Sequence, residues 1–154
     1  MLEAKGNLWT YPAQARIITT NGTIKKNGEC VMGRGCAREA VVGVNNKCGS
    51  WPGLPSILGA SVATDGNHVA FLGACVTPAT GVLYSFPVKH NWYERADIKL
   101  IKRSAAELVV QAGLSGWTKL VLPRPGCGNG GLRWEDVRPI LEPILDDRFT
   151  VISF

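Results

Sequence analysis

Short apolar runs alternate along this chain with stretches in which apolar residues recur at helical spacing. Four runs are rich in β-branched or large apolar residues and predict strands: Ala15–Thr20, Val82–Phe86, Leu120–Leu122 and Thr150–Phe154. The segments between them are long enough for helices. Strands that alternate with helices predict an α/β fold with a largely parallel or mixed sheet.

Helical spacing is clearest from Ala96 to Ala112, where apolar residues lie on one face of an amphipathic helix. Gly113 and Gly116 are expected to end that helix. Another helix is expected to follow the segment 31–37 and to run through Val44. Because the carboxyl ends of parallel strands meet at one edge of a sheet, polar residues that follow the strands would share one crevice there.

Three segments carry turn or proline signals. Ser61–Leu72 predicts a hairpin around an Asp-Gly-Asn turn, although its first arm would also suit the end of a short helix from Pro55. Pro87 is expected to stop the strand that begins at Val82. The last helix contains two prolines, and an interior proline costs about 3 kcal/mol, so we expect it to start near Pro139 or to be kinked.

Two of the strand-to-helix connections are rich in glycine. The first lies within Val31–Ala37, and the second, Gly126–Gly131, holds four glycines in six residues. Loop N–H groups and the positive end of a helix dipole favour an anion, most often phosphate, and glycine lets the backbone approach it closely. Two such loops that face each other would hold the two phosphates of one ligand.

The second glycine loop also allows two other interpretations. It would suit a tight turn with no ligand. Alternatively, Gly126, Gly128 and Gly131 match the G-x-G-x-x-G pattern of dinucleotide-binding folds. That pattern should open a βαβ unit with an acidic residue about 20 positions later, whereas only one helix and one strand follow here. The dinucleotide interpretation therefore lacks its second half.

Length and composition favour a single domain, 1–154, of ordinary globular type. The chain is 45% hydrophobic and 19% charged, with a net charge of +5 that favours nucleotides or nucleic acid as partners. The positive excess lies in the first two thirds of the chain. We expect no membrane segment and no signal peptide, and therefore a cytoplasmic location.

The five cysteines are Cys30, Cys36, Cys48, Cys75 and Cys127. They form no C-x-x-C pair, and the two histidines do not complete a zinc pattern, so we expect reduced thiols and no metal. Cys127 lies inside the second glycine loop. A small packing residue is favoured over a nucleophile there, because nothing nearby in the sequence would activate the thiol.

These features resemble the macro domain family of ADP-ribose-binding modules and ADP-ribosyl hydrolases. The matching segments are Gly6–Leu8, Thr20–Gly22, Met32–Ala37 and Pro125–Val137, so the resemblance covers nearly the whole chain. Ser85–Trp92 and Gly126–Glu135 look most like the macro domain of DNA ADP-ribosyl glycohydrolase antitoxins, which reverse ADP-ribosylation of single-stranded DNA by partner toxins. The resemblance implies a three-layer α/β/α sandwich with a central mixed sheet.

The resemblance also implies roles for particular residues. Lys89 would be the catalytic lysine, and Asn21 would lie beside the distal ribose. The first phosphate loop would be Gly33, Arg34 and Gly35, and the second Gly126, Cys127, Gly128, Asn129, Gly130 and Gly131. No metal or cofactor is implied. Related hydrolases that act on carboxylate side chains carry an aspartate in the second loop, where this chain has Gly130, which favours the DNA-directed branch.

The expected function is a hydrolase that binds ADP-ribose and removes it from a thymine base of DNA. Lys89 would act as an ammonium at the leaving base, or as a neutral amine that attacks C1″. The expected partners are ADP-ribose, ADP-ribosylated single-stranded DNA and a cognate ADP-ribosyltransferase toxin. The alternatives are a non-catalytic binder of ADP-ribose or a related nucleotide, a phosphatase for ADP-ribose 1″-phosphate, and a general nucleic-acid-binding protein. Trp92 would stack on a base or pack in the core.

Overall fold

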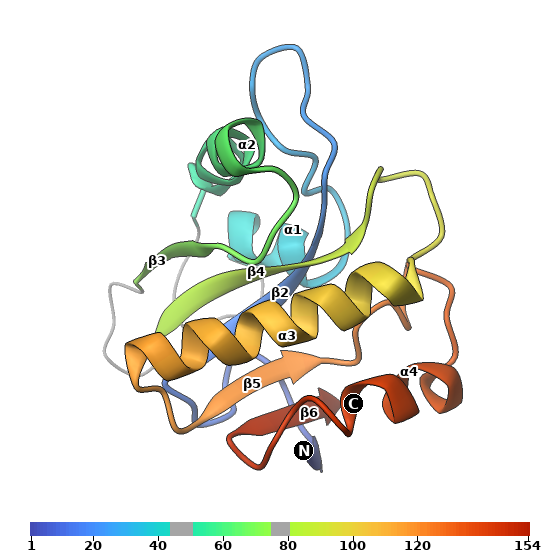
Figure 1. Ribbon diagram of the computed structural model, residues 1–154. Coiled ribbons are helices and arrows are strands. Elements are labelled where there is room, and N and C mark those ends of the chain that lie inside the picture. The colour runs from blue at the N-terminus through green and yellow to red at the C-terminus, as the bar shows by residue number, and fades with distance from the viewer. Residues whose placement is uncertain (44–50, 75–80) are drawn as a thin grey trace.

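A computed structural model describes residues 1–43, 51–74 and 81–154 (Figure 1). Its centre is a six-stranded sheet with the strand order β1-β6-β5-β2-β4-β3. Every pairing in the sheet is parallel except that of β3 with β4, so the sheet is mixed. The strands are β1 (Leu2–Lys5), β2 (Ala15–Asn21), β3 (Phe71–Ala74), β4 (Val82–Lys89), β5 (Leu120–Pro123) and β6 (Phe149–Ser153).

Helices cover both faces of this sheet (Figure 1). The helices are α1 (Gly35–Val42), α2 (Leu54–Asp65), α3 (Ile98–Ser115) and α4 (Trp134–Leu141). One hydrophobic cluster joins α3 and α4 to one face of the sheet, and a second joins α1 and α2 to the other. The expected three-layer α/β/α sandwich is confirmed.

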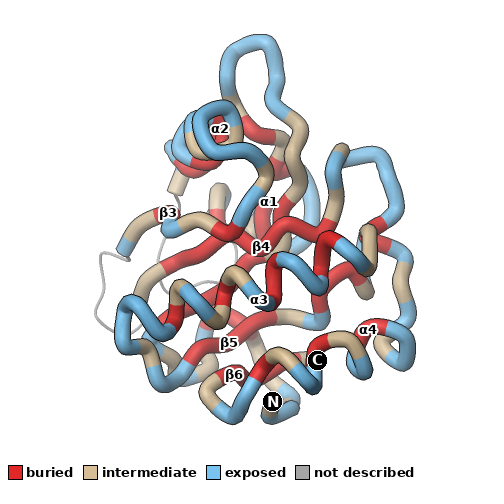
Figure 2. Tube along the Cα trace, in the orientation of Figure 1, coloured by how far each residue is buried: buried red, intermediate tan, exposed pale blue. Residues whose placement is uncertain are grey.

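The central strands are buried on both faces, which explains why their sequences are mainly apolar (Figure 2). In β5, Leu120 and Leu122 pack toward α3 and α4, whereas Val121 between them packs toward α1 and α2. In β2, Ile17 and Ile18 divide in the same way. The side-chain period of two along a strand therefore supplies both cores from the same short segments.

The predicted hairpin at Ser61–Leu72 is wrong, and the alternative of a helix from Pro55 is correct. Helix α2 runs to Asp65, and Gly66 ends it with a φ of 87° while its N–H donates to Val62 O at 2.9 Å. The buried side chains of Leu54 and Leu58 hold this helix on the sheet. The Asp-Gly pair is therefore the end of a helix and not a hairpin turn, because glycine suits both.

Pro87 does not stop β4, which continues to Lys89. The N–H of Ser85 donates to Ala70 O on the β3 side, so the nitrogen of Pro87, two residues later, faces the same side. The pairing of β3 with β4 reaches only Tyr84, which leaves no ladder bond for Pro87 to break.

Helix boundaries differ from the sequence predictions at several points. Helix α3 passes through Gly113 and ends at Gly116, whose φ is 72°. Helix α4 begins at Trp134, well before Pro139, so the predicted start is wrong; its buried Val137 and Leu141 hold it in place despite the interior proline. The strand β1 was not predicted. The expected end of the first helix at Val44 lies outside the described residues, as do Cys48 and Cys75.

Candidate active site

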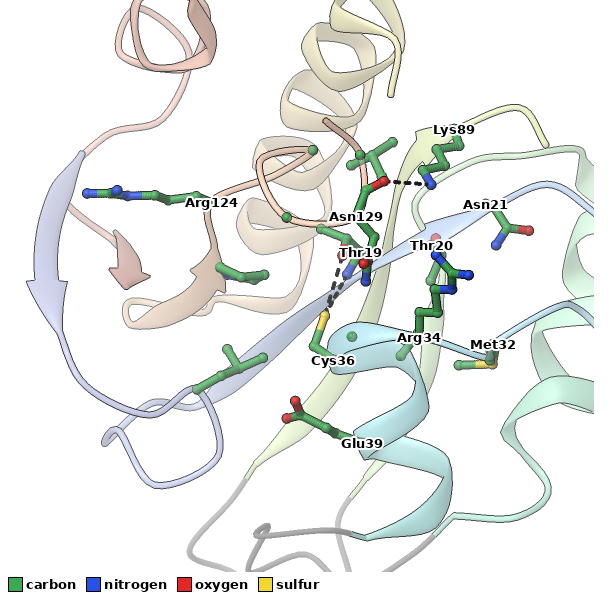
Figure 3. Close-up of a pocket in the computed structure, with 18 of the residues that line it drawn as sticks. Thr19, Thr20, Asn21, Met32, Arg34, Cys36, Glu39, Lys89, Arg124 and Asn129 are labelled. Atoms are coloured by element: carbon green, nitrogen blue, oxygen red, sulfur yellow. Dashed lines mark hydrogen bonds between the residues drawn. The ribbon is translucent and has the colours of Figure 1, made fainter. Parts of the chain in front are cut away.

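A cavity of about 720 Å³ lies along the edge of the sheet where the parallel strands end (Figure 3). Its lining includes Asn7 after β1, Ser153 of β6, Pro123 of β5, Asn21 of β2 and Lys89 of β4. Neighbouring strands lie about 4.8 Å apart, so five of them give a site about 19 Å long. The predicted crevice at the carboxyl edge is therefore present, and its shape suits an extended ligand.

The first glycine loop brings the amino end of a helix to this cavity. Gly33, Arg34 and Gly35 all line it, and α1 begins at Gly35. The N-cap residue Arg34 makes no side-chain hydrogen bond to the helix end. Within the described residues, the N–H groups of these three residues donate no hydrogen bond. They are therefore available to an anion, and the helix dipole favours its charge.

The second glycine loop is built differently. The N–H groups of Gly131 and Leu132 fold the loop by donating to Gly128 O at 3.1 Å and Gly126 O at 2.9 Å. Among the described residues, the N–H groups of Gly128, Asn129 and Gly130 donate no hydrogen bond, and these residues line the cavity. Helix α4 starts only at Trp134, which is not part of the lining. The helix dipole expected from the sequence therefore acts at the first loop and not at the second.

The two loops meet across the cavity (Figure 3). A Cβ atom built on Gly35, whose φ is +59°, would lie 3.4 Å from Asn129 Nδ2 of the opposite loop. Two sets of unused N–H groups thus line neighbouring parts of one cavity. Such an arrangement suits a ligand with two adjacent phosphates.

Gly130 leaves no room for the aspartate that related protein-directed hydrolases carry. A Cβ atom at this position would lie 2.5 Å from Gly126 O and 2.8 Å from Ala96 Cβ. Any side chain would have to displace the backbone of its own loop. The packing beneath the loop therefore agrees with the glycine found at position 130 in place of an aspartate.

Lys89 lies at the β4 end of the cavity, where its Nζ is held by two backbone carbonyls. It donates to Trp92 O and to Asn129 O, each at 3.2 Å (Figure 3). An ammonium group has three N–H donors, so one remains for a bound ligand. The contact with Asn129 also ties the lysine to the second glycine loop.

Asn21 joins β2 to the segment that leads into the first glycine loop. Its Nδ2 donates to Val31 O at 2.9 Å, and its Oδ1 accepts from the N–H of Thr23 at 3.0 Å. A side-chain amide carries two N–H donors and two acceptor lone pairs. One N–H donor of the amide therefore remains for a ligand, while Oδ1 also has the Cys30 thiol as a weak donor at 4.0 Å, and these contacts fix the orientation of the amide.

The thiols near the site are poor nucleophiles. Cys127 lies outside the lining, donates to Pro125 O at 3.4 Å, and packs against the α3 side of the core. Burial raises the pKa of Cys127 to about 11. Cys36 does line the cavity, and burial raises its pKa as well, although its hydrogen bonds with Thr19 oppose the shift. At neutral pH both remain thiols.

Of the residues expected at the site, the structure brings all but two into this cavity. Cys127 points into the core, and Gly131 lines a neighbouring hollow instead. Trp92 does not pack in the core, since the residue is 48% exposed and lines the cavity.

Several lining residues were missed by the sequence analysis. Asn7, Thr20 and Arg124 follow or end parallel strands, and that position alone would have suggested them. Glu39 lies one helical turn after Gly35 and accepts from Trp9 Nε1 at 2.6 Å. The Oγ1 of Thr20 is buried and has no hydrogen-bond partner within the described residues. Helical spacing from the first glycine loop would have pointed to Glu39.

Two further observations limit the kinds of site present in the described part of the chain. No group of three or more His, Cys, Asp or Glu side chains is arranged there to hold a metal ion. None of the helices described in the structure is both long and apolar enough to cross a membrane.

Solved structures share this architecture. The macrodomain of Mycobacterium tuberculosis DarG superposes with a TM-score of 0.77 over 99% of this chain and 97% of its own, at 19% sequence identity. The Thermus aquaticus DarG macrodomain gives a TM-score of 0.73 at 22% identity, over 99% of this chain and 97% of its own. The chain has the macrodomain fold. Thermosipho africanus DarTG in complex with ADP-ribose contains the same macrodomain fold, with a TM-score of 0.79 at 19% identity, over 97% of this chain and 40% of that one.

Sequence similarity to a curated protein is restricted to one segment. A DNA ADP-ribosyl transferase-DNA ADP-ribosyl glycohydrolase fusion protein of Thermosipho africanus (strain H17ap60334) is 36% identical over 56 residues. This segment is 36% of the present chain and 14% of the relative, so most of that protein has no matched counterpart here. No protein-family model matches the sequence.

Proposed function

We propose that this macrodomain is an ADP-ribosyl hydrolase that removes ADP-ribose from a base of DNA, with Lys89 as its catalytic residue. The observation that carries the proposal is the order of groups along the cavity: two sets of unused loop N–H groups in the middle, and a lysine held by two carbonyls at one end. The complex of a protein of the same fold with ADP-ribose and the glycohydrolase name of the curated relative support it.

The strand order supports one orientation of the ligand. A diphosphate between the glycine loops would direct one end of the ligand toward the ends of β2 and β4, where Asn21 and Lys89 lie, and the other toward β1 and β6. The β1 end includes Asn7, Glu39 and Phe154 and would take the adenosine. The distal ribose then lies at Asn21, whose remaining N–H donor suits a ribose hydroxyl.

The reaction breaks the bond between C1″ of the distal ribose and a base nitrogen. The electron pair of that bond goes to the base nitrogen and C1″ becomes cationic. Water then adds to C1″ and releases a proton, and the base nitrogen takes up one, so that the products are ADP-ribose and the unmodified base. In this proposal the ammonium of Lys89 donates its third N–H to the departing base and stabilises the negative charge that develops there. Glu39, whose side-chain carboxylate lines the main cavity, lies away from Lys89 (Figure 3), so the lysine carries the leaving-group step.

The test follows release of ADP-ribose from a single-stranded oligonucleotide that is ADP-ribosylated on thymine. Wild type should release it, and Lys89→Ala should lower the rate by about 10²-fold or more while ADP-ribose binding stays within about tenfold. Lys26→Ala is a matched control, because Lys26 is exposed and outside the cavity lining, and it should behave as wild type. Binding of ADP-ribose without any release by wild type would contradict the hydrolase and leave a binding module, or a phosphatase if ADP-ribose 1″-phosphate were hydrolysed instead.

The role of Lys89 has its own test. A neutral amine that attacked C1″ would form an imine-type adduct that borohydride reduces to a stable covalent product. The two carbonyl contacts of Nζ suit a charged donor, so we expect no increase in protein mass when borohydride is added during turnover. A trapped adduct at Lys89 would replace the ammonium step with covalent catalysis.

The biological setting belongs to the same proposal. The domain would counter an ADP-ribosyltransferase toxin by removing its product from DNA, as the paired activities in the name of the curated relative suggest. We place it in the cytoplasm as one domain over 1–154. The free thiols of Cys30, Cys36 and Cys127 are compatible with a reducing compartment.

A further inference from the structure

A second hollow, of about 410 Å³, adjoins the Lys89 end of the main cavity. Both are lined by Arg34, Lys89, Trp92, Asn129 and Gly130, so the two hollows are continuous. The second one adds Tyr93, Glu94, Arg95 and Gly131 to the lining. A group that is attached to the distal ribose and extends past Lys89 would therefore enter this second hollow.

Two aromatic rings border the hollow and are largely in contact with solvent. Trp92 is 48% exposed and Tyr93 is 70% exposed, and the rings meet edge to face with centroids 5.8 Å apart and planes at 88°. The segment that carries them is nevertheless fixed, because the N–H of Trp92 donates to Thr23 Oγ1 at 3.0 Å and its carbonyl accepts from Lys89. Held aromatic rings with open faces are the platforms on which unpaired bases stack.

Positive charge accompanies the rings. The hollow has Arg34, Lys89 and Arg95 in its lining against a single acid, Glu94. Arg95 is oriented by the hydrogen bond from its Nη2 to Gly131 O at 3.1 Å, and its side chain lies over the second glycine loop. A guanidinium held in this way is suited to a phosphate, because this bond uses one of its five N–H donors and the residue is exposed.

We infer that this hollow is a strand-binding site that holds the nucleotides next to the modified base in single-stranded DNA. The inference rests on the proposed function and adds the path of the acceptor strand to it. A neighbouring base stacks on Tyr93 and Trp92, and the phosphate beside it contacts Arg95. Open stacking faces, a cationic lining and continuity with Lys89 together favour a nucleic-acid strand over a peptide, which would supply neither stacked bases nor backbone phosphates.

The experiment compares two substrates of the same chemistry. The first is thymidine ADP-ribosylated on its base, and the second carries the same nucleotide within a five-nucleotide single strand. For wild type we expect kcat/KM to be about tenfold or more higher for the oligonucleotide, mainly through KM. Tyr93→Ala and Arg95→Gln should each lose most of that gain and leave the nucleoside reaction unchanged.

Two control variants separate stacking and charge from general damage. Tyr93→Phe keeps the aromatic ring and should therefore keep the higher kcat/KM for the oligonucleotide. Arg133→Gln removes an exposed arginine that pairs with Asp136 at 3.0 Å and lines neither hollow, so it should match wild type on both substrates. Equal kcat/KM for the two substrates in wild type, or an undiminished gain in Tyr93→Ala and Arg95→Gln, would overturn the strand-binding site while leaving the hydrolase intact.

Binding measurements keep the inference testable if no hydrolysis is found. Lys89→Ala protein should bind a fluorescent ADP-ribosylated pentanucleotide about tenfold more tightly than a labelled ADP-ribosylated thymidine, and additional Tyr93→Ala should remove the difference. The same gain from an ADP-ribosylated pentapeptide, or from a blunt duplex that carries the modification, would assign the hollow to another acceptor and overturn the inference.

Discussion

The two glycine loops of the cavity look alike in sequence but differ in their exposure and packing. In the first, Gly33, Arg34 and Gly35 are all exposed and lead straight into α1. In the second, Gly126 and Gly130 are buried and pack on Ala96 and the start of α3, as the short distances to their hypothetical Cβ atoms show. Packing therefore explains the glycines of part of the second loop, whereas it does not explain those of the first, which agrees with the proposed binding of a phosphate there.

The difference extends to electrostatics. The first loop has a helix dipole and the side chain of Arg34 directed at the cavity, whereas the second has only backbone N–H groups and the nearby ammonium of Lys89. The two loops are alike at Gly33 and Gly128, because a Cβ atom at either position would meet no heavy atom within 4 Å. These contrasts give four measurable expectations.

The largest effect is expected from Gly130→Ala. The added methyl group would lie 2.5 Å from Gly126 O and 2.8 Å from Ala96 Cβ, so the loop or α3 must shift. We expect a loss of about 1–3 kcal/mol in the free energy of unfolding, visible as a lower midpoint in urea denaturation. Unchanged stability would show that the second loop is as open as the first.

A smaller effect is expected from Gly33→Ala and Gly128→Ala. Neither should change the free energy of unfolding by more than about 0.5 kcal/mol. Each should weaken ADP-ribose binding by about tenfold in calorimetry, because the methyl group keeps a phosphate away from the N–H groups. Gly113→Ala, an open position in α3 far from the cavity lining, is the control and should leave binding unchanged. Unchanged ADP-ribose affinity in both loop variants would show that the loops do not bind the phosphates.

Arg34→Gln tests the charge that only the first loop carries. We expect ADP-ribose affinity to fall about fivefold at low salt, with a smaller difference at 0.5 M NaCl, because salt screens the interaction of an exposed arginine with a phosphate. Calorimetry at the two salt concentrations measures this. A loss of affinity that does not depend on salt would instead indicate a change in loop shape.

The smallest effect is expected from the cysteines of the two loops. Because burial raises the pKa values of Cys36 and Cys127, the latter to about 11, the thiolate fractions at pH 7.5 are small. Alkylation by iodoacetamide, followed at each site by peptide mass spectrometry, should be slow at pH 7.5 and should speed up as the pH rises toward 11. Cys127→Ala should leave the rate of ADP-ribose release within about twofold. Rapid alkylation of Cys127 at pH 7.5 would contradict the packing role.

Much of the fold was predictable because its strands are buried on both faces. Val82–Phe86 and Leu120–Leu122 are mainly apolar runs, and the structure has strands at both. Two of the failures share one cause, which is that glycine and proline have several structural uses. Gly66 ends a helix where a hairpin was expected, and Pro87 lies inside a strand because its nitrogen faces an unpaired side.

The candidate site was predictable to a similar degree. The glycine loops were recognisable because glycine clusters after strands leave local signals in the sequence, whereas Asn21 and Lys89 were singled out by the resemblance of the segments around them. Glu39 and Thr20 were missed, although helical spacing from the first glycine loop would have pointed to Glu39 and a position near the end of a parallel strand would have pointed to Thr20. The hollow beside Lys89 depends on Arg95 lying over Gly131, a contact between distant segments.

The most direct test of the central claim is a titration of ¹⁵N-labelled protein with ADP-ribose, followed by the backbone amide resonances of the two glycine loops. If one diphosphate lies between the loops, the amide protons of Gly33 and Gly35 and those of Gly128 and Gly130 should move downfield together and with one dissociation constant. Movement in only one loop, or in neither, would contradict the account.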